Sequence, residues 1–173
     1  MNVAKKWWFW VIIGVVGLAA IGSVVGTVTK SDSNSSSTTN NTTTKTYGMY
    51  ETVVVKDLEF KITGVTDTKH VGSSYLGQDT DANFAIVTIQ IKNTSNSEKT
   101  VYSDNFKYQR GESVYEASSA GIYAGDNGFY VLKEIGAGLT KTLDVVYEIP
   151  STHESTDYII AKDSYKSEKI YLK

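Results

Sequence analysis

The chain has 173 residues and no cysteine, which excludes disulfide bonds, thiolate metal sites and thiol catalysis. Its charge is divided unevenly. Residues 1–46 carry four lysines and one aspartate, whereas residues 47–173 carry 13 basic and 18 acidic side chains, a net charge of −5. An acidic domain repels the phosphate backbone of nucleic acids, so we expect no nucleic-acid partner.

Residues 1–29 have the composition of a membrane anchor. Lys5 and Lys6 precede a run of 22 residues, from Trp7 to Val28, that contains no charged side chain. As a helix this run would span about 33 Å, enough to cross a hydrocarbon core of about 30 Å. Because positive flanking charges remain in the cytoplasm, we predict a single-pass transmembrane helix, a signal-anchor, with the N-terminus inside the cell and the following domain outside.

A cleaved signal peptide is the alternative for the same segment. Small residues such as Ala19 and Ala20 lie where a signal peptidase could act. The apolar region of a signal peptide is usually only about 7–15 residues long, and the segment has no clear Ala-x-Ala site. The retained anchor is therefore the preferred interpretation, and cleavage stays open.

Residues 30–46 read KSDSNSSSTTNNTTTKT and contain no apolar side chain. A segment of this composition cannot bury enough surface to offset the entropy lost on ordering it. We predict a disordered Ser/Thr/Asn-rich linker that tethers the following domain to the anchor.

Residues 47–173 show the period-two alternation of β-strands. Between residues 85 and 92, Ala85, Val87, Ile89 and Ile91 alternate with residues that are mostly polar. Residues 58–63 and 142–149 repeat the pattern, and shorter candidate strands are residues 52–56, 106–109, 158–161 and 169–172. About seven short strands, each with one apolar face, predict an all-β fold of two packed sheets, a β-sandwich.

Four stretches carry a resemblance to a known family: residues 52–65, 83–95, 100–117 and 136–150. In this order they resemble the DUF4352 domain, a family of bacterial surface domains related to MPT63, a secreted mycobacterial antigen. The resemblance implies an immunoglobulin-like β-sandwich outside the cytoplasm and implies no enzymatic activity. The chain departs from lipoprotein members of the family because it has no cysteine, and it has Gly136-Ala137-Gly138 where such domains often carry a Pro-Gly turn.

Residues that could support catalysis are scarce. His70 and His153 each lie among polar and turn-forming residues, where a histidine is most often solvated. The sequence contains no nucleophile elbow, no phosphate-binding glycine loop and no zinc-protease motif. We therefore expect a domain that is not an enzyme and has no cofactor.

One spacing raises a calcium hypothesis. Asp79, Asp81 and Asn83 have the 1, 3, 5 spacing with which an EF-hand calcium loop begins. The rest of that pattern fails, because Phe84 occupies the glycine position and Gln90 the position of the bidentate glutamate. The alternative is a solvated loop between two strands.

The connections between strands are the candidate working surface, since a sandwich scaffold commits its strands to the core. Residues 118–138 and the neighbouring loop of residues 75–83 are the candidates, and the possible partner-binding residues are Tyr75, Tyr123, Phe129 and Tyr130. The alternative for residues 118–138 is a further strand or short helix that closes the core.

These observations predict a membrane-anchored recognition or adhesion module of the bacterial cell envelope. Its partner would be an unknown protein or envelope polymer. The alternatives are a structural or accessory envelope module, and a secreted antigen-like protein released by signal cleavage. The sequence does not identify the partner or the oligomeric state.

Overall fold

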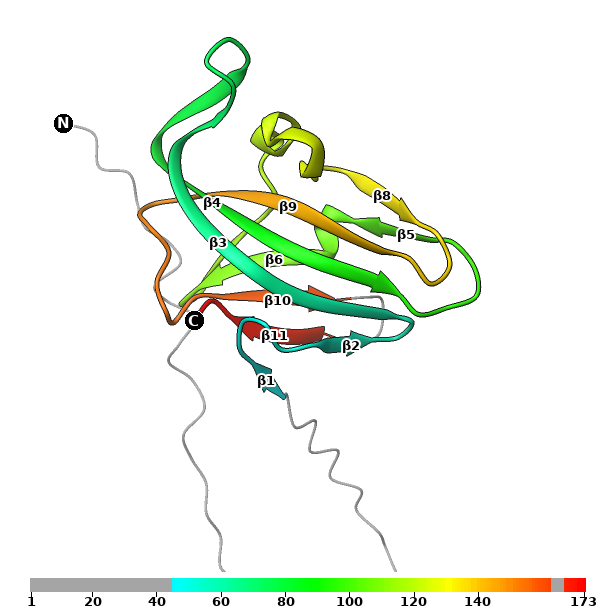
Figure 1. Ribbon diagram of the computed structural model, residues 1–173. Helices are drawn as coiled ribbons and strands as arrows, with labels where there is room; N and C mark the ends of the chain where they lie inside the picture. The colour runs from blue at the N-terminus through cyan, green and yellow to red at the C-terminus, as the bar shows by residue number, and fades with distance from the viewer. Residues whose placement is uncertain (1–44, 163–166) are drawn as a thin grey trace, which may run out of the picture. The chain divides into compact units, whose positions relative to one another are not determined.

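Strands dominate the part of the chain described by the computed structural model, residues 45–162 and 167–173 (Figure 1). They are β1 Thr46–Tyr47, β2 Val53–Val55, β3 Leu58–Gly72, β4 Gly77–Asn93, β5 Lys99–Tyr102, β6 Phe106–Arg110, β7 Ser113–Tyr115, β8 Leu132–Ile135, β9 Thr140–Ile149, β10 Tyr158–Lys162 and β11 Ser167–Tyr171. Three short 3-10 helices join them: η2 Ser103–Asn105, η3 Ser119–Tyr123 and η4 Gly125–Asn127.

The strands form three sheets. A five-stranded sheet has the order β1-β11-β10-β6-β7, a four-stranded sheet has the order β2-β3-β4-β9, and β5 pairs with β8. Every pairing between these strands is antiparallel except that of β1 with β11. The predicted all-β sandwich is confirmed, with eleven strands in the described residues where the sequence predicts about seven. The additional strands are short: β1 and β7 lie at the two edges of the five-stranded sheet, and β5 and β8 pair only with each other.

The core follows from the alternation of apolar residues. Val87 and Ile89 on β4 are fully buried, as the sequence predicts, and they share one cluster with Phe106 of β6 and Ile159 of β10 from the facing sheet. The rings of Phe60 and Phe106 meet edge to face across the sandwich with centroids 5.1 Å apart. Such aromatic pairs stabilise a core beyond the area that they bury.

A second, smaller cluster lies on the outer face of the four-stranded sheet. It contains Val71, Phe84, Ala120 and Val146, all buried. The alternation of apolar residues along β9 predicts that Val146 faces solvent, but in the structure Val146 is buried. Ser118, just before η3, donates from its backbone nitrogen to the carbonyl oxygen of Val146 (2.7 Å), so η3 covers this part of the sheet.

β3 and β4 continue beyond the sandwich as a long hairpin, here called the arm (residues 69–82; Figure 1, upper part). β9 pairs with β4 only from Asn83 onward, so the arm is a two-stranded ribbon. Residues 75–83 are therefore not a loop: only Ser73 to Leu76 connect the strands. The alternation of apolar residues does not continue into the arm because no second sheet covers it.

The predicted anchor (residues 1–29) lies outside the described residues, as does the predicted linker up to residue 44. β1 begins at Thr46, one residue earlier than the predicted domain boundary. Among residues 45–162 and 167–173, no helix has the length and apolar character needed to span a membrane.

Candidate functional site

The structure brings together the two segments that the sequence singles out as a working surface. A groove runs between the arm and the η3–η4 segment, across the outer face of the four-stranded sheet. Its walls come from the arm and the η3–η4 segment, and its floor comes from β3, β4 and β9. It is lined by Thr66, Thr68, His70, Val71, Gly72, Ser73, Leu76, Ile86, Ile122, Tyr123, Ala124, Gly125 and Asp144.

Two glycines determine the shape of the arm tip. Gly72 has a φ of +116°, and a Cβ there would lie 2.4 Å from the carbonyl oxygen of Leu76. A Cβ on Gly77 would lie 2.5 Å from the carbonyl oxygen of Val71. Because both contacts are with backbone atoms, a larger residue at either position would force the tip open. Ser73 N donates to Leu76 O (2.8 Å) and closes the turn.

His70 and Asp79 form a cross-strand pair just below this turn. The His70 Nδ1 lies 2.8 Å from Asp79 Oδ1, and the Nε2 lies 3.1 Å from the Ser73 carbonyl oxygen. Both partners accept hydrogen bonds, so the imidazolium satisfies both, and the Asp79 hydrogen bond is the main cause that raises the pKa of His70 above 6.5. The pair therefore favours the closed tip below pH 6.5 and loses this effect as the pH rises through the raised pKa.

Three apolar side chains are exposed at this end of the molecule. Tyr75 at the turn is 97% exposed, its neighbour Leu76 66%, and Ile122 of η3 65%. Tyr123 is half-buried and packs against the small outer cluster. Of the predicted partner-binding residues, Tyr75 is thus freely presented and Tyr123 lies in the groove wall.

Phe129 does not belong to any surface, which corrects its assignment as a partner-binding residue. It is 1% exposed, and its ring meets that of Phe106 edge to face at 6.4 Å. Ile135 is also buried in the core. Each interpretation of residues 118–138 therefore holds for part of the segment. Phe129 and Ile135 close the core, while Ile122 faces solvent. Tyr130 is half-buried beside β5 and is not among the residues that line the groove between the arm and η3.

The three residues of the calcium hypothesis occupy alternate positions of β4. At a strand rise of about 3.3 Å per residue, the outer two are separated by about 13 Å, too far to share one ion. Asp79 contacts His70, and the buried Asn83 donates from Nδ2 to Asp67 Oδ1 (2.7 Å). The structure thus does not bring Asp79, Asp81 and Asn83 together, and the described residues hold no group of three or more His, Asp or Glu side chains suited to a metal ion.

His153 also has a structural partner. Its backbone nitrogen donates to Asp67 Oδ1 (3.0 Å), and its Nδ1 lies 2.6 Å from Asp67 Oδ2. Asp67 thereby joins the loop after β9 to β3, and through Asn83 to β4. This arrangement secures the base of the arm.

A buried ion pair links β6 to the segment before β10, and sequence reasoning did not identify it. Arg110 Nε donates to Asp157 Oδ1 (3.0 Å), Tyr108 donates from its hydroxyl to Asp157, and Glu154 N donates to Asp157 Oδ2 (2.7 Å). Burial alone would raise the pKa of Asp157, but the hydrogen bonds from Arg110, Tyr108 and the Glu154 backbone lower it below its ordinary value. Arg110 also reaches Thr152 O (2.8 Å), so the cluster stabilises the fold and does not line the groove.

Comparison with solved structures shows the same architecture in proteins from Bacillus subtilis and Mycobacterium tuberculosis. The yjhA protein from Bacillus subtilis superposes with a TM-score of 0.55 at 12% identity, covering 73% of this chain and 99% of that one. The secreted protein MPT63 from Mycobacterium tuberculosis gives 0.52 at 11% identity, covering 75% and 96%. A putative lipoprotein from Bacillus subtilis, ycdA, gives 0.51 at 16% identity, covering 69% of this chain and 38% of that one. At these identities the likeness shows the fold alone.

Sequence comparison identifies the family. None of the curated proteins compared with the chain matches it. The family model described as "Domain of unknown function (DUF4352)" matches residues 47–170. This range is more than half of the chain and contains every described strand from β2 to β10. The resemblance carried by the four sequence stretches is thereby confirmed, and the protein belongs to the DUF4352 family.

Proposed function

We propose that this protein is a surface-displayed recognition module of the cell envelope that binds a partner protein through the arm tip and η3. The observation that carries the proposal is that the exposed side chains of Leu76 and Ile122 line one groove, and that Tyr75, next to Leu76 in the chain, is 97% exposed. Scattered exposed apolar residues need no explanation, but apolar residues gathered beside a groove are typical of interaction sites.

The chemistry of the groove favours a protein over a polysaccharide. Leu76 and Ile122 are aliphatic, and they suit apolar side chains better than the hydroxyl-rich surface of a sugar polymer. Tyr75 provides a large, rigid contact that loses little conformational entropy on binding, as tyrosines do in antibody loops. Polar groups such as His70 and Asp144 border these residues, which matches the apolar centre and polar rim of protein interfaces.

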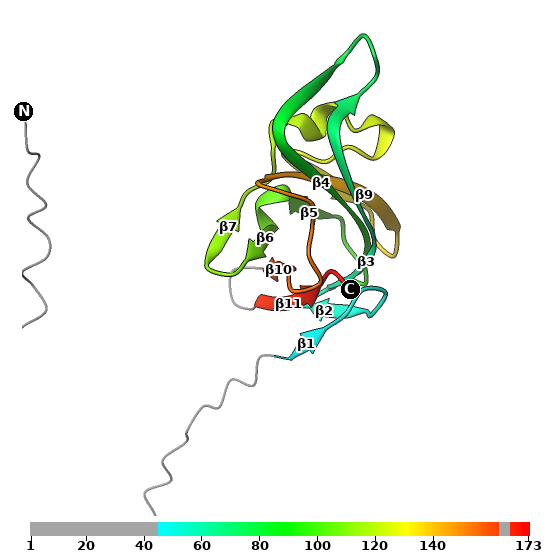
Figure 2. The same cartoon turned by 90° about the vertical axis from the view of Figure 1, so that its left-hand side faces the viewer.

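The position of the arm in the domain supports a role of its tip in binding at the cell surface. In both views of the domain the arm lies at the end away from β1, where the chain enters the fold (Figures 1 and 2). If residues 1–29 anchor the chain as their composition predicts, the tether enters the domain at β1 and not at the arm tip. Solved proteins of similar fold are described as a secreted protein and a putative lipoprotein, which agrees with an extracytoplasmic location.

The binding proposal is tested by photo-crosslinking in cells that produce the full chain. A photoreactive phenylalanine derivative in place of Leu76 is expected to give a discrete protein adduct, whereas the same group in place of Val114, exposed on β7, gives none. Replacing Tyr75 by alanine together with Ile122 by serine should lower the yield at least about tenfold, as for residues central to an interface. Labelling only of an envelope polymer would contradict a protein partner and favour polymer recognition, whereas labelling only of lipid, or equal labelling from position 114, would favour an accessory module.

The location is tested by protease treatment of intact cells. We expect the protease to remove residues 47–173 and to leave a membrane-bound N-terminal fragment, because Lys5 and Lys6 precede the uncharged run. Breaking the cells first is the control for protease activity. Protection of the domain in intact cells would contradict the orientation, and a mature chain that begins after the apolar run would show that the anchor is cleaved.

A further inference from the structure

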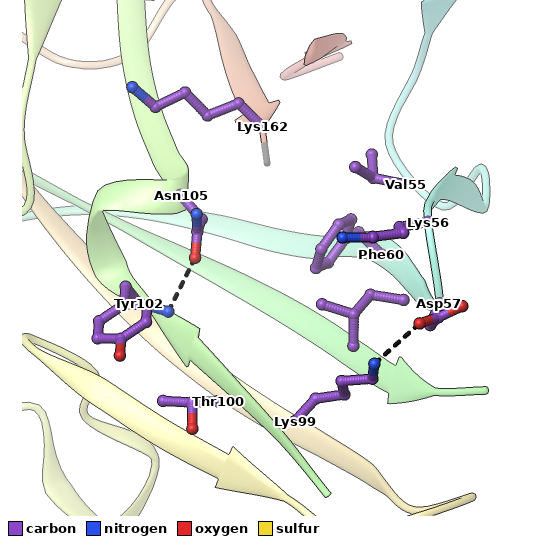
Figure 3. A pocket seen from close by; sticks show the side chains of 10 residues that line it. Val55, Lys56, Asp57, Phe60, Lys99, Thr100, Tyr102, Asn105 and Lys162 are labelled. Atoms are coloured by element: carbon purple, nitrogen blue, oxygen red, sulfur yellow. Dashed lines mark hydrogen bonds and ion pairs between the residues drawn. The ribbon is translucent and has the colours of Figure 1, made fainter. Parts of the chain in front are cut away.

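One edge of β3 has no neighbouring strand over much of its length, in the part of the chain that the structure describes. β2 pairs only with residues 58–60, at the start of the 15-residue strand β3. The turn between β2 and β3 is joined to β5, because Asp57 Oδ2 lies 2.9 Å from Lys99 Nζ (Figure 3). Beyond this fixed start, β3 continues past β2 towards the arm and leaves its edge open (Figure 1).

Local hydrogen bonds close the open stretch at both ends. At its start, Tyr50 N donates to Ile62 O (2.9 Å). At its end, the Thr68 hydroxyl donates to His70 O (2.9 Å) and accepts from His70 N (3.2 Å). Native proteins usually cover or interrupt the edges of their sheets, because an open edge recruits other strands. Residues 63–68 lie between these two closures.

The direction of the backbone groups in this stretch follows from the bonds of β9. In an antiparallel sheet each residue directs both of its backbone groups to one neighbouring strand, and the next residue directs them to the other. Val146 of β9 accepts from Ser118 N, so its backbone points away from β4. Its partner on β4, Ile86, therefore directs its backbone to β3, where it pairs with Thr66. Thr66 is thus bonded to β4.

Val65 and Asp67, on either side of Thr66, consequently direct their N–H and C=O groups outward, away from β4. The structure shows no hydrogen bond from the described residues to these backbone groups on the open side. The carboxylate of Asp67 is engaged separately, by Asn83 and His153. The open edge therefore presents two backbone donors and two backbone acceptors, spaced as in a strand that awaits a partner.

The side chains of the open stretch border both faces of the sheet. Val65 is half-buried and packs against the core on the inner face. Thr66 and Thr68 line the arm groove on the outer face, together with Leu76 and Ile122. A strand added at this edge would run alongside the groove, and its alternate side chains would reach the groove and the border of the core.

We propose that the partner protein is held at this edge by an extended segment of about five residues, which adds to the four-stranded sheet beside β3. Its main chain bonds to the backbone groups of Val65 and Asp67, and its outer side chains enter the arm groove. In complexes formed by strand addition, main-chain hydrogen bonds give affinity and pockets for alternate side chains give specificity. The inference rests on the proposed function of the arm groove and states how the partner is bound there.

Proline substitutions test the direction of the backbone groups in the protein itself. Val65→Pro removes an N–H group that points outward, whereas Thr66→Pro removes one that bonds to β4. In urea unfolding of the full chain in a neutral detergent, we expect the midpoint of Val65→Pro to lie near that of Val65→Ala and the midpoint of Thr66→Pro to lie clearly lower. Equal midpoints for the two proline variants would overturn the assignment of the open edge.

Photo-crosslinking from position 76 in cells tests the strand addition. Val65→Pro should lower the adduct yield at least about tenfold, because it removes one hydrogen bond and places a ring where the added strand would lie. Val65→Ala is the matched control: it shortens the same side chain and keeps the N–H group, so the yield should change little. An equal loss in both variants would overturn the role of the backbone.

The outcomes separate this inference from the proposed function. An unchanged adduct from position 76 in Val65→Pro would leave the groove as the binding site and overturn the added strand. An adduct only from a photoreactive group at Thr66, lost in Val65→Pro, would support the added strand and overturn the groove. Adducts from neither position would overturn both. An adduct with the mass of two copies of this chain would show that β3 edges pair with each other and would overturn a separate partner.

Discussion

Replacing Asp157 by alanine is expected to lower the free energy of unfolding by about 3–5 kcal/mol, because it leaves the charge of a partly buried arginine without its partner. Asp157 is 0% exposed, and it accepts hydrogen bonds from Arg110, Tyr108 and the Glu154 backbone. Urea unfolding of the wild-type and variant chains, followed by circular dichroism, measures the difference. Asp126→Ala on the exposed η4 is the matched control, and it should change stability by no more than about 0.5 kcal/mol.

The same ion pair makes the free energy of unfolding depend on pH, and it stabilises the fold less at acidic pH. The pKa of Asp157 in the folded state lies below its ordinary value of 3.8. The stabilisation is therefore fully present above pH 3.8 and is lost as the pH falls through the lower folded-state pKa. Asp157→Ala should remove this part of the acid sensitivity. An unchanged slope of stability against pH below 4, or a stability loss no larger than that of Asp126→Ala, would contradict the role of the pair.

Replacing Phe129 by alanine is expected to cost about 3–5 kcal/mol, as for other buried aromatic residues. The reason is its position in the core, 1% exposed and packed edge to face on Phe106. Ile122→Ala, in the same segment but 65% exposed, should cost less than about 1 kcal/mol. The two unfolding midpoints in urea compare them directly. Similar costs for both variants would show that residues 118–138 are not divided between core and surface as the structure has them.

The sequence predicts the strands that lie between the two sheets because burial on one face imposes alternation. β4 and β9 are the clearest cases, since Val87, Ile89 and Val145 are fully buried where the pattern places them. The alternation does not predict the arm, because most residues of this ribbon are exposed or half-buried and Val71 alone among its apolar strand residues is buried, against η3 and not against a second sheet. It also fails at Val146, where η3 covers a position that faces solvent in an ordinary sandwich.

The candidate site, too, could be predicted from the sequence only in part. Residues 75–83 and 118–138 could be identified as neighbouring connections, but only the structure shows that Phe129 points into the core while Leu76 and Ile122 face solvent. Contacts between residues far apart in the chain leave no local pattern. The pairing of Arg110 with Asp157 is of this kind.

The pairing of β1 has a mechanical consequence. β1 is held to β11 by a parallel pairing of only two residues, Thr46 and Tyr47. Before β2 begins at Val53, two further backbone hydrogen bonds hold the segment: Met49 N to Lys173 O (3.4 Å) and Tyr50 N to Ile62 O (2.9 Å). A pull on the chain from its N-terminal side would break these few bonds first and leave the ladders of β3, β4 and β9 intact. Release of residues 46–52 would lengthen the chain by roughly 20 Å. Under load, the entry segment would thus detach from the domain before the sandwich unfolds.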